Sequence, residues 1–91
     1  MLNKDIYEKA CQYLARREHG YQEIFRKIKR KFDEIEDIEI FKVLDILVSK
    51  NYLSDTRACE MYIKNQVKKG YGPTKIKQHL FSKGLPREIS E

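Results

Sequence analysis

Apolar residues recur every three or four positions along most of the chain, which is the spacing that places them on one side of an α-helix. Short breaks that contain glycine, asparagine or serine separate five such stretches. The pattern therefore predicts an all-α fold, with helices over residues 5–18, 21–32, 33–50, 56–69 and 73–82.

The apolar stripe of each helix indicates which of its sides is buried. The third helix has the widest stripe, so it is expected to be the most buried, with Ile38 and Val48 on its inner side. Val67 and Phe81 continue the stripes of the last two helices and are assigned to the core. Leu85 is expected to pack back onto the last helix.

Residues with known preferences for helix ends mark the boundaries. Asp5 and Glu8 have the spacing of a capping box at the start of the first helix. Gly20 is expected to end that helix, and Asn51 can take the left-handed conformation that closes the third. Ser54-Asp55 is a capping pair for the fourth helix.

The clearest break in the pattern is Gly70-Tyr71-Gly72-Pro73. The glycines on either side of the tyrosine allow a positive φ angle at low cost. Pro73 suits the first turn of a helix, with Gly72 or Thr74 as its N-cap. A degenerate copy of this break occurs at Glu18-His19-Gly20-Tyr21.

The two breaks belong to an internal repeat. A shift of 52 positions keeps small and apolar residues in phase and aligns Gly20 with Gly72, Ile24 with Ile76 and Ile28 with Leu80. The repeat predicts two helix-turn-helix-like units of three helices, residues 1–53 and 54–91. The second unit would lack most of its third helix, whose first turn is expected at Pro86-Arg87-Glu88-Ile89.

Charge is distributed unevenly along the sequence. Residues 1–31 hold nine Lys and Arg against four Asp and Glu, residues 32–62 hold three against eight, and residues 63–91 hold seven against two. The acidic run at 33–39 is favoured at the start of a helix by the helix dipole. Two basic ends around an acidic middle suggest a partner of matching charge, such as nucleic acid or a protein that coats it.

The second predicted helix carries five cations with no acid between them: Arg26, Lys27, Lys29, Arg30 and Lys31. One interpretation is the solvated side of an ordinary amphipathic helix, and the other is a binding surface. Aromatic residues do not interleave with these cations along the sequence, as they would in a platform for single-stranded nucleic acid.

Recognisable catalytic and metal-binding patterns are absent from the sequence. It has no Walker A loop, GxGxxG, HExxH, GxSxG or paired-cysteine motif. His19 and His79 are interpreted as surface or turn histidines, and Cys11 and Cys59 as reduced, partly buried thiols. With no apolar run long enough for a membrane span and no signal peptide, the sequence indicates a cytoplasmic binding module without cofactor, metal or enzymatic activity.

Three segments, in this order, resemble the signatures of the RecX family. They are Tyr13-Leu14-Ala15-Arg16-Arg17-Glu18-His19 with Glu23 and Ile24; Val43-Leu44-Asp45-Ile46-Leu47 followed by Asn51-Tyr52-Leu53-Ser54-Asp55-Thr56-Arg57-Ala58; and Lys69-Gly70-Tyr71-Gly72-Pro73 with Ile76, Leu80 and Lys83-Gly84. The resemblance extends from Ile6 to Leu85.

The resemblance implies a fold and a role. RecX proteins are bacterial regulators of the RecA recombinase, built of tandem three-helix repeats in an elongated, curved molecule. They are thought to lie in the groove of the RecA–DNA filament and to lower its ATPase and strand-exchange activities in DNA repair, recombination and the SOS response. The chain is accordingly expected to bind that filament and inhibit the recombinase. The alternative is a helix-turn-helix-like module that contacts DNA directly and without sequence specificity.

Long cations on the helix surfaces are the expected contacts to an acidic, DNA-containing filament. The candidates are Arg16, Arg17, Arg26, Lys27, Arg30, Lys68, Lys69, Lys75, Lys77 and Lys83. Tyr71 is a further candidate, either as a stacking or hydrogen-bonding edge at the turn or as a plug in the core.

The chain departs from the family pattern in the number of repeats. Family members usually have three, whereas this sequence accounts for one repeat and part of a second. An incomplete second repeat would leave apolar flanks of its two helices uncovered. This predicts a homodimer that covers them.

Overall fold

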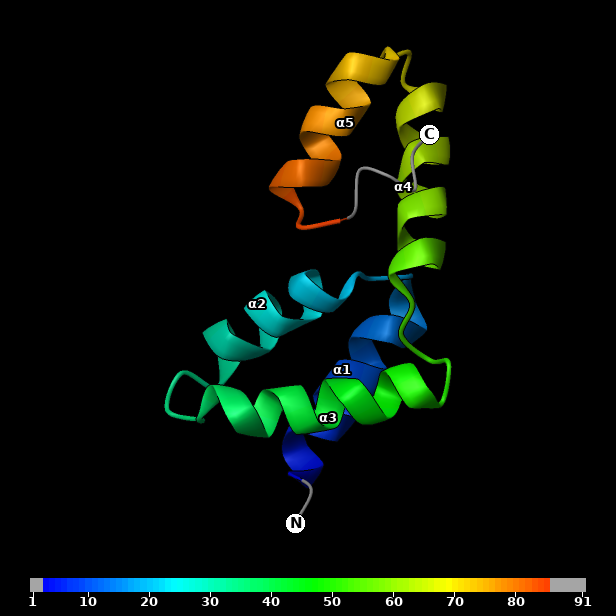
Figure 1. The fold of residues 1–91 in the computed structure, drawn as a ribbon. Coiled ribbons are helices and arrows are strands. Elements are labelled where there is room, and N and C mark those ends of the chain that lie inside the picture. The colour runs from blue at the N-terminus through cyan, green and yellow to red at the C-terminus, as the bar shows by residue number, and fades with distance from the viewer. Residues whose placement is uncertain (1–2, 86–91) are drawn as a thin grey trace.

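A computed structural model describes residues 3–85, and this part of the chain is all-helical and without strands. The helices are α1 (Lys4–Arg16), α2 (Tyr21–Lys31), α3 (Asp37–Ser49), α4 (Asp55–Lys68) and α5 (Pro73–Ser82). Figure 1 shows α1, α2 and α3 packed together, with α4 and α5 rising from them as an antiparallel pair. The molecule is elongated, with extents of 44 × 24 × 21 Å.

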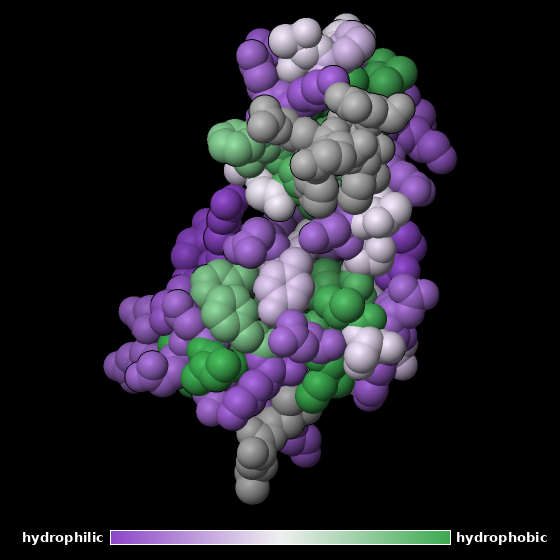
Figure 2. All heavy atoms as spheres, viewed as in Figure 1, coloured by the Kyte–Doolittle hydropathy of each residue, from purple (hydrophilic) through white to green (hydrophobic). Residues whose placement is uncertain are grey.

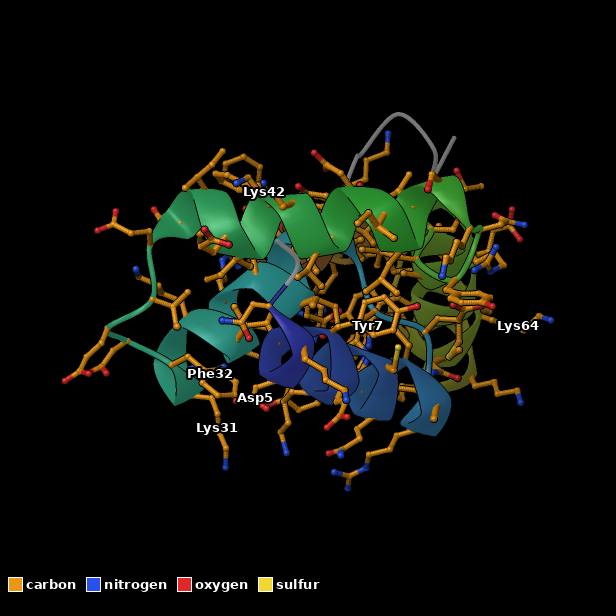
Figure 3. All side chains as sticks on the ribbon, turned by 90° about the horizontal axis from the view of Figure 1, so that it is seen from below. Asp5, Tyr7, Lys31, Phe32, Lys42 and Lys64 are labelled. Atoms are coloured by element: carbon orange, nitrogen blue, oxygen red, sulfur yellow. The ribbon has the colours of Figure 1, made fainter. Side chains whose placement is uncertain are left out.

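The first three helices enclose the larger core. Its centre is formed by aliphatic side chains of all three helices and of the loop after α3: Ile6, Ala10, Ile24, Ile28, Ile40, Val43, Leu44, Leu47 and Leu53. In Figure 3 Tyr7 points between α1 and α3, whereas Lys31 projects into solvent. Burial of this apolar area supplies most of the free energy that holds the three helices together.

The α4–α5 pair has a smaller core of Ala58, Cys59, Ile76, Leu80 and Leu85. Leu85 packs back as expected, and its backbone N–H donates to the carbonyl of Leu80 at 2.9 Å. Gly84, at φ 74°, makes that reversal. A two-helix pair with so few buried side chains depends on further contacts for its stability.

Several helix ends are those that the sequence predicts. The Ser54 hydroxyl accepts from the N–H of Arg57 at 3.2 Å, and Gly72 is the N-cap of α5. Asn51 has φ 63° and Gly70 has φ 89°, both in the left-handed region. The predicted capping box at Asp5 is wrong, because Asn3 is the N-cap and its side chain accepts from the N–H of Ile6 at 3.1 Å.

Two predicted boundaries are also wrong. α1 ends at Arg16 rather than Glu18, since Arg17 is fully extended and leads the chain away towards α2, where Gly20 is the N-cap. The acidic run starts α3 only from Asp37, with Glu36 as N-cap. The residues between α2 and Glu36 form a turn instead of the first turn of the helix.

Four apolar residues assigned to the core are exposed. The exposed fractions are 57% for Ile38, 48% for Val48, 60% for Val67 and 67% for Phe81. Ile38 and Val48 lie on the flank of α3, because the buried side of that helix is centred on Ile40, Val43, Leu44 and Leu47. Within residues 3–85, α4 and α5 pack mainly against each other, so a single narrow side of each is buried. The expected sixth helix at 86–89 lies outside the described residues.

Candidate binding surface

The start of α2 is the joint between the two groups of helices. The Glu23 carboxylate accepts from Arg17 Nη2 at 2.7 Å and lies 3.5 Å from Lys83 Nζ, so it links α1 to the end of α5. It also accepts from the N–H of Gly20 at 3.3 Å. Burial opposes ionisation of Glu23, but the Arg17 and Gly20 hydrogen bonds, with the charges of Arg17 and Lys83, outweigh it and lower its pKa.

Two further polar contacts cross the joint. The N–H of Tyr21 donates to Asp55 Oδ1 at 2.7 Å, which ties the first turn of α2 to the first turn of α4. Arg57 Nε donates to Glu18 Oε2 at 2.7 Å, between α4 and the loop after α1. These buried or half-buried charges fix how the α4–α5 pair stands on the first three helices.

A close steric contact reinforces the joint. A Cβ atom added to Gly20 would lie 2.5 Å from Leu85 Cδ2 and 3.1 Å from Asp55 Oδ1. One added to Gly84 would lie 2.9 Å from Gln22 Cβ. The turn after α5 therefore rests directly on the first turn of α2, and this approach requires the absence of a side chain at position 20.

His19 lies in the turn between α1 and α2, one of the two positions expected for it, and there its side chain is buried rather than on the surface. Its Nδ1 lies 3.0 Å from the carbonyl oxygen of Arg17, and its Nε2 lies 2.8 Å from Lys27 Nζ. Since a carbonyl only accepts and an ammonium only donates, the ring is neutral with its proton on Nδ1. Burial first, and then the charges of Arg17 and Lys27, lower the pKa of His19 despite the Arg17 carbonyl and the Glu23 carboxylate, which raise it.

Six of the predicted contact residues gather around this joint, and a seventh lines a hollow that extends from it. Arg17, Arg26, Lys27, Arg30 and Lys83 line one hollow together with Glu23 and Ser82. Arg16 joins them in an adjoining hollow with Tyr13 and His19. Lys69, the C-cap at the far end of α4, lines a third hollow, which Arg17 and Lys83 also line. Residues from α1, α2, α4 and the end of α5 thus form one continuous basic surface.

The other four candidates lie elsewhere. Lys68, Tyr71, Lys75 and Lys77 line none of these hollows and belong to the far end of α4, the turn after it and α5. Tyr71 is 41% exposed and stands edge-on to His79, with ring centroids 5.3 Å apart, so it is not a core plug. His79 Nδ1 bonds to the Oε1 atom of the buried Gln66 at 2.8 Å.

Aromatic rings do lie among the cations in space, contrary to the sequence-based expectation. Lys9 and Lys27 each place Nζ 5.2 Å from the centre of the Tyr13 ring. Phe25 lines a hollow with Arg26, Lys29, Arg30 and Asp33. The sequence does not place Tyr13 beside these cations because Tyr13 comes from another helix. It does not identify Phe25 as a surface ring because its periodicity matches a core position.

The rings of α2 and α3 form a stack at the surface. Phe25 and Phe41 are nearly parallel with centroids 4.9 Å apart, and Tyr21 continues the row 6.4 Å from Phe41. Figure 2 shows an apolar and aromatic strip over α2 and α3, bordered by hydrophilic side chains. The Tyr21 hydroxyl donates to Asp45 at 2.8 Å. Burial, and then this bond and the Asp45 charge, raise the pKa of Tyr21.

No helix between residues 3 and 85 combines the length and apolar character needed to cross a membrane. In the same part of the chain, no three His, Cys, Asp or Glu side chains are grouped so that they could hold a metal ion.

Residues 54–91 match the family model described as RecX, second three-helix domain. The chain is 40% identical over 78 residues to Regulatory protein RecX of Pseudomonas fluorescens strain SBW25, a match that covers 86% of the chain and 49% of the relative. The protein of the same name from Pseudomonas syringae pv. tomato is 39% identical over 82 residues, 90% of the chain and 52% of the relative.

Similarity is not confined to one genus. Regulatory protein RecX of Cronobacter sakazakii is 33% identical over an alignment of 94 positions, covering 94% of the chain and 57% of the relative. The chain spans about half the length of the curated relatives it matches. Its all-helical fold agrees with the three-helix domain that the family model describes. Over the residues that these matches cover, the chain belongs to the RecX family.

Proposed function

We propose that this protein binds the RecA recombinase filament on DNA and inhibits the recombinase, without catalysing a reaction itself. The observation that carries the proposal is the continuous basic surface at the joint, on a chain whose relatives are named regulatory proteins. A filament that contains DNA phosphates and acidic protein surface would attract such a surface from a distance. This role would place the protein in the cytoplasm.

The cations of the surface have different parts in this proposal. Arg17 and Lys83 are paired with Glu23 and hold the joint. Arg16 and Arg30 are exposed and make no hydrogen bond or ion pair within residues 3–85, so their charge is available to a partner. Arg16 and Arg30 are therefore the side chains whose change should affect binding most and folding least.

A recombinase assay tests the proposal. Arg16→Glu with Arg30→Glu should abolish most inhibition of the RecA ATPase on single-stranded DNA, because two attractive charges become repulsive. Lys64→Glu with Lys75→Glu makes the same change of net charge at exposed positions that line none of the hollows of this surface, and should reduce inhibition less. Equal loss for both pairs would show that only net charge matters. No inhibition by the unchanged protein would refute the proposal.

Direct, sequence-independent binding to duplex DNA is the second candidate function. The outward side of α2, with its run of five cations, favours it. Such binding should weaken steeply with salt, as counterions are released from each phosphate that is neutralised. Binding to naked duplex DNA that is tight and unchanged by a RecA coat would favour this candidate over the first.

The arrangement of the chain carries two further proposals. Residues 1–53 are proposed as the first three-helix repeat and 54–91 as the second.

The exposed Val67 on α4 is the kind of apolar side chain that a second copy of the chain would cover in a homodimer. A sedimentation mass equal to one chain at high protein concentration would exclude the dimer.

A further inference from the structure

The hollow beside Phe25 combines an aromatic wall with cations of α2. Phe25 lies on one side of it, and Arg26, Lys29 and Arg30 line the rest together with Asp33. Arg26 and Arg30 are one helical turn apart, so their guanidinium groups stand next to each other on the same side of α2. Phe25 packs against the edge of the larger core, whereas the two arginines are exposed and belong to neither core.

One face of the Phe25 ring is covered by Phe41, at 4.9 Å between centroids and 17° between planes. Phe41 does not line the hollow, so the hollow borders a part of the Phe25 ring that Phe41 does not cover. The stack with Phe41 holds the ring in place before any ligand arrives. By contrast, Tyr13 already has Lys9 and Lys27 over its ring.

The cations around the hollow differ in what they can still bind. Lys29 pairs with Asp37 at 2.7 Å and donates to the carbonyl of Ile35 at 2.9 Å, so it holds the turn after α2. Arg26 donates from Nη1 to the carbonyl of Ser82 at 3.2 Å, which uses one of its five N–H donors. Arg30 makes no hydrogen bond or ion pair within the described residues.

We propose that this hollow is a site for single-stranded DNA, in which one base stacks on Phe25 and the adjoining phosphates bind Arg26 and Arg30. A ring face and neighbouring guanidinium groups are what one nucleotide and its backbone require. Duplex DNA does not fit, because its bases are already stacked on one another. An acidic peptide would use the arginines but has no flat ring system for Phe25.

The inference deepens the proposed function, since the recombinase filament is built on single-stranded DNA, but it is tested without the recombinase. The probe is a fluorescent oligo(dT) of about 12 nucleotides, matched with an abasic oligomer of the same length and charge. Binding to the whole chain is followed by anisotropy over a salt series. Far-ultraviolet circular dichroism and melting confirm that each variant is folded.

Phe25→Leu should weaken oligo(dT) binding about tenfold, the range for loss of one base–aromatic stack, and leave abasic binding unchanged. Phe25→Tyr keeps a ring and should retain binding to oligo(dT). Arg30→Gln should weaken binding to both oligomers and reduce the slope of log K against log salt by about 0.7, which corresponds to one phosphate contact on a single strand. Lys64→Gln is the matched control, since Lys64 projects away from α4 on the other group of helices (Figure 3).

A change at Asp33 tests the site by strengthening the binding of DNA instead of weakening it. Asp33 lines the hollow beyond the end of α2, where its carboxylate would repel the phosphate backbone. Asp33→Asn should therefore tighten binding to both oligomers a few-fold.

The inference is overturned if Phe25→Leu changes oligo(dT) and abasic binding equally, if it changes neither, or if the unchanged protein binds no oligo(dT) at low salt. A protein that inhibits the recombinase while its DNA binding ignores Phe25 would retain the proposed function and lose this site. A protein that binds oligo(dT) through Phe25 without inhibiting the recombinase would retain this site and lose the proposed function.

Discussion

Single side chains at the joint make contacts that their place in the sequence does not reveal. Glu23 looks like one surface acid on a basic helix, yet its side chain is only 12% exposed and contacts two cations and a backbone N–H. No spacing rule connects it to Lys83, 60 positions along the chain. His19 is comparable, because its burial follows from how α1, α2 and the loop between them meet.

Glu23→Gln should lower the free energy of unfolding by about 1–2 kcal/mol, because Arg17 and Lys83 lose their shared counter-charge while the amide still accepts from Gly20. Chemical denaturation in urea at neutral pH measures the change. Glu39→Gln is the control, since its pair with Lys42 is exposed and 3.9 Å long and should contribute close to nothing. Equal effects of the two changes would contradict the part assigned to Glu23.

Because of His19, we expect the free energy of unfolding to fall in mild acid. The pKa of His19 is lowered in the folded state, so the unfolded chain takes up a proton first as the pH falls below about 6.5. The stability is fully present above that pH and is lost as the pH falls towards the lower folded pKa. Melting temperatures from pH 8 to pH 5 should show the loss, and His19→Gln should show a smaller one. The lowered pKa of Glu23 adds its own loss only below about pH 4.5.

At the scale of helices, much could be predicted from the sequence. The five helices and the caps at Ser54 and Gly72 follow from residue preferences that act within a turn or two. The inward side of each helix was predicted less well, because the number of neighbouring helices decides how wide a stripe is buried. Val67 and Phe81 have the right periodicity for a core, but α4 and α5 mainly face each other.

The candidate surface could likewise be predicted from the sequence only in part. Its cations could be named from the sequence, but not which of them meet, because Arg17, Arg26, Lys69 and Lys83 come from four parts of the chain. Periodicity identifies Phe25 as apolar and cannot show that one side of its ring borders a hollow. Contacts between distant segments were therefore the part that only the structure could supply.

The two helix-starting glycines provide a comparison within one chain. Gly20 and Gly72 are N-caps with similar extended backbones, but within residues 3–85 only Gly20 of the two has atoms within 4 Å of where a Cβ would lie. Gly20→Ala should lower the free energy of unfolding by about 1–3 kcal/mol through its conflict with Leu85, whereas Gly72→Ala should change it little. Differential scanning calorimetry distinguishes them. A smaller penalty for Gly20→Ala in a Leu85→Ala background would confirm the contact.

At the scale of the whole molecule, the contact between Leu85 and Gly20 sets an order of events during folding. Among residues 3–85, the core of the first three helices includes no residue after Leu53, so it can form before the rest of the chain has been synthesised. The core of α4 and α5 includes Leu85, the last residue that the structure describes, and Leu85 packs on the start of α2. The second group of helices thus completes its core on a surface that the first must already provide, and amide protons of α5 should exchange with solvent sooner than those of α1 to α3.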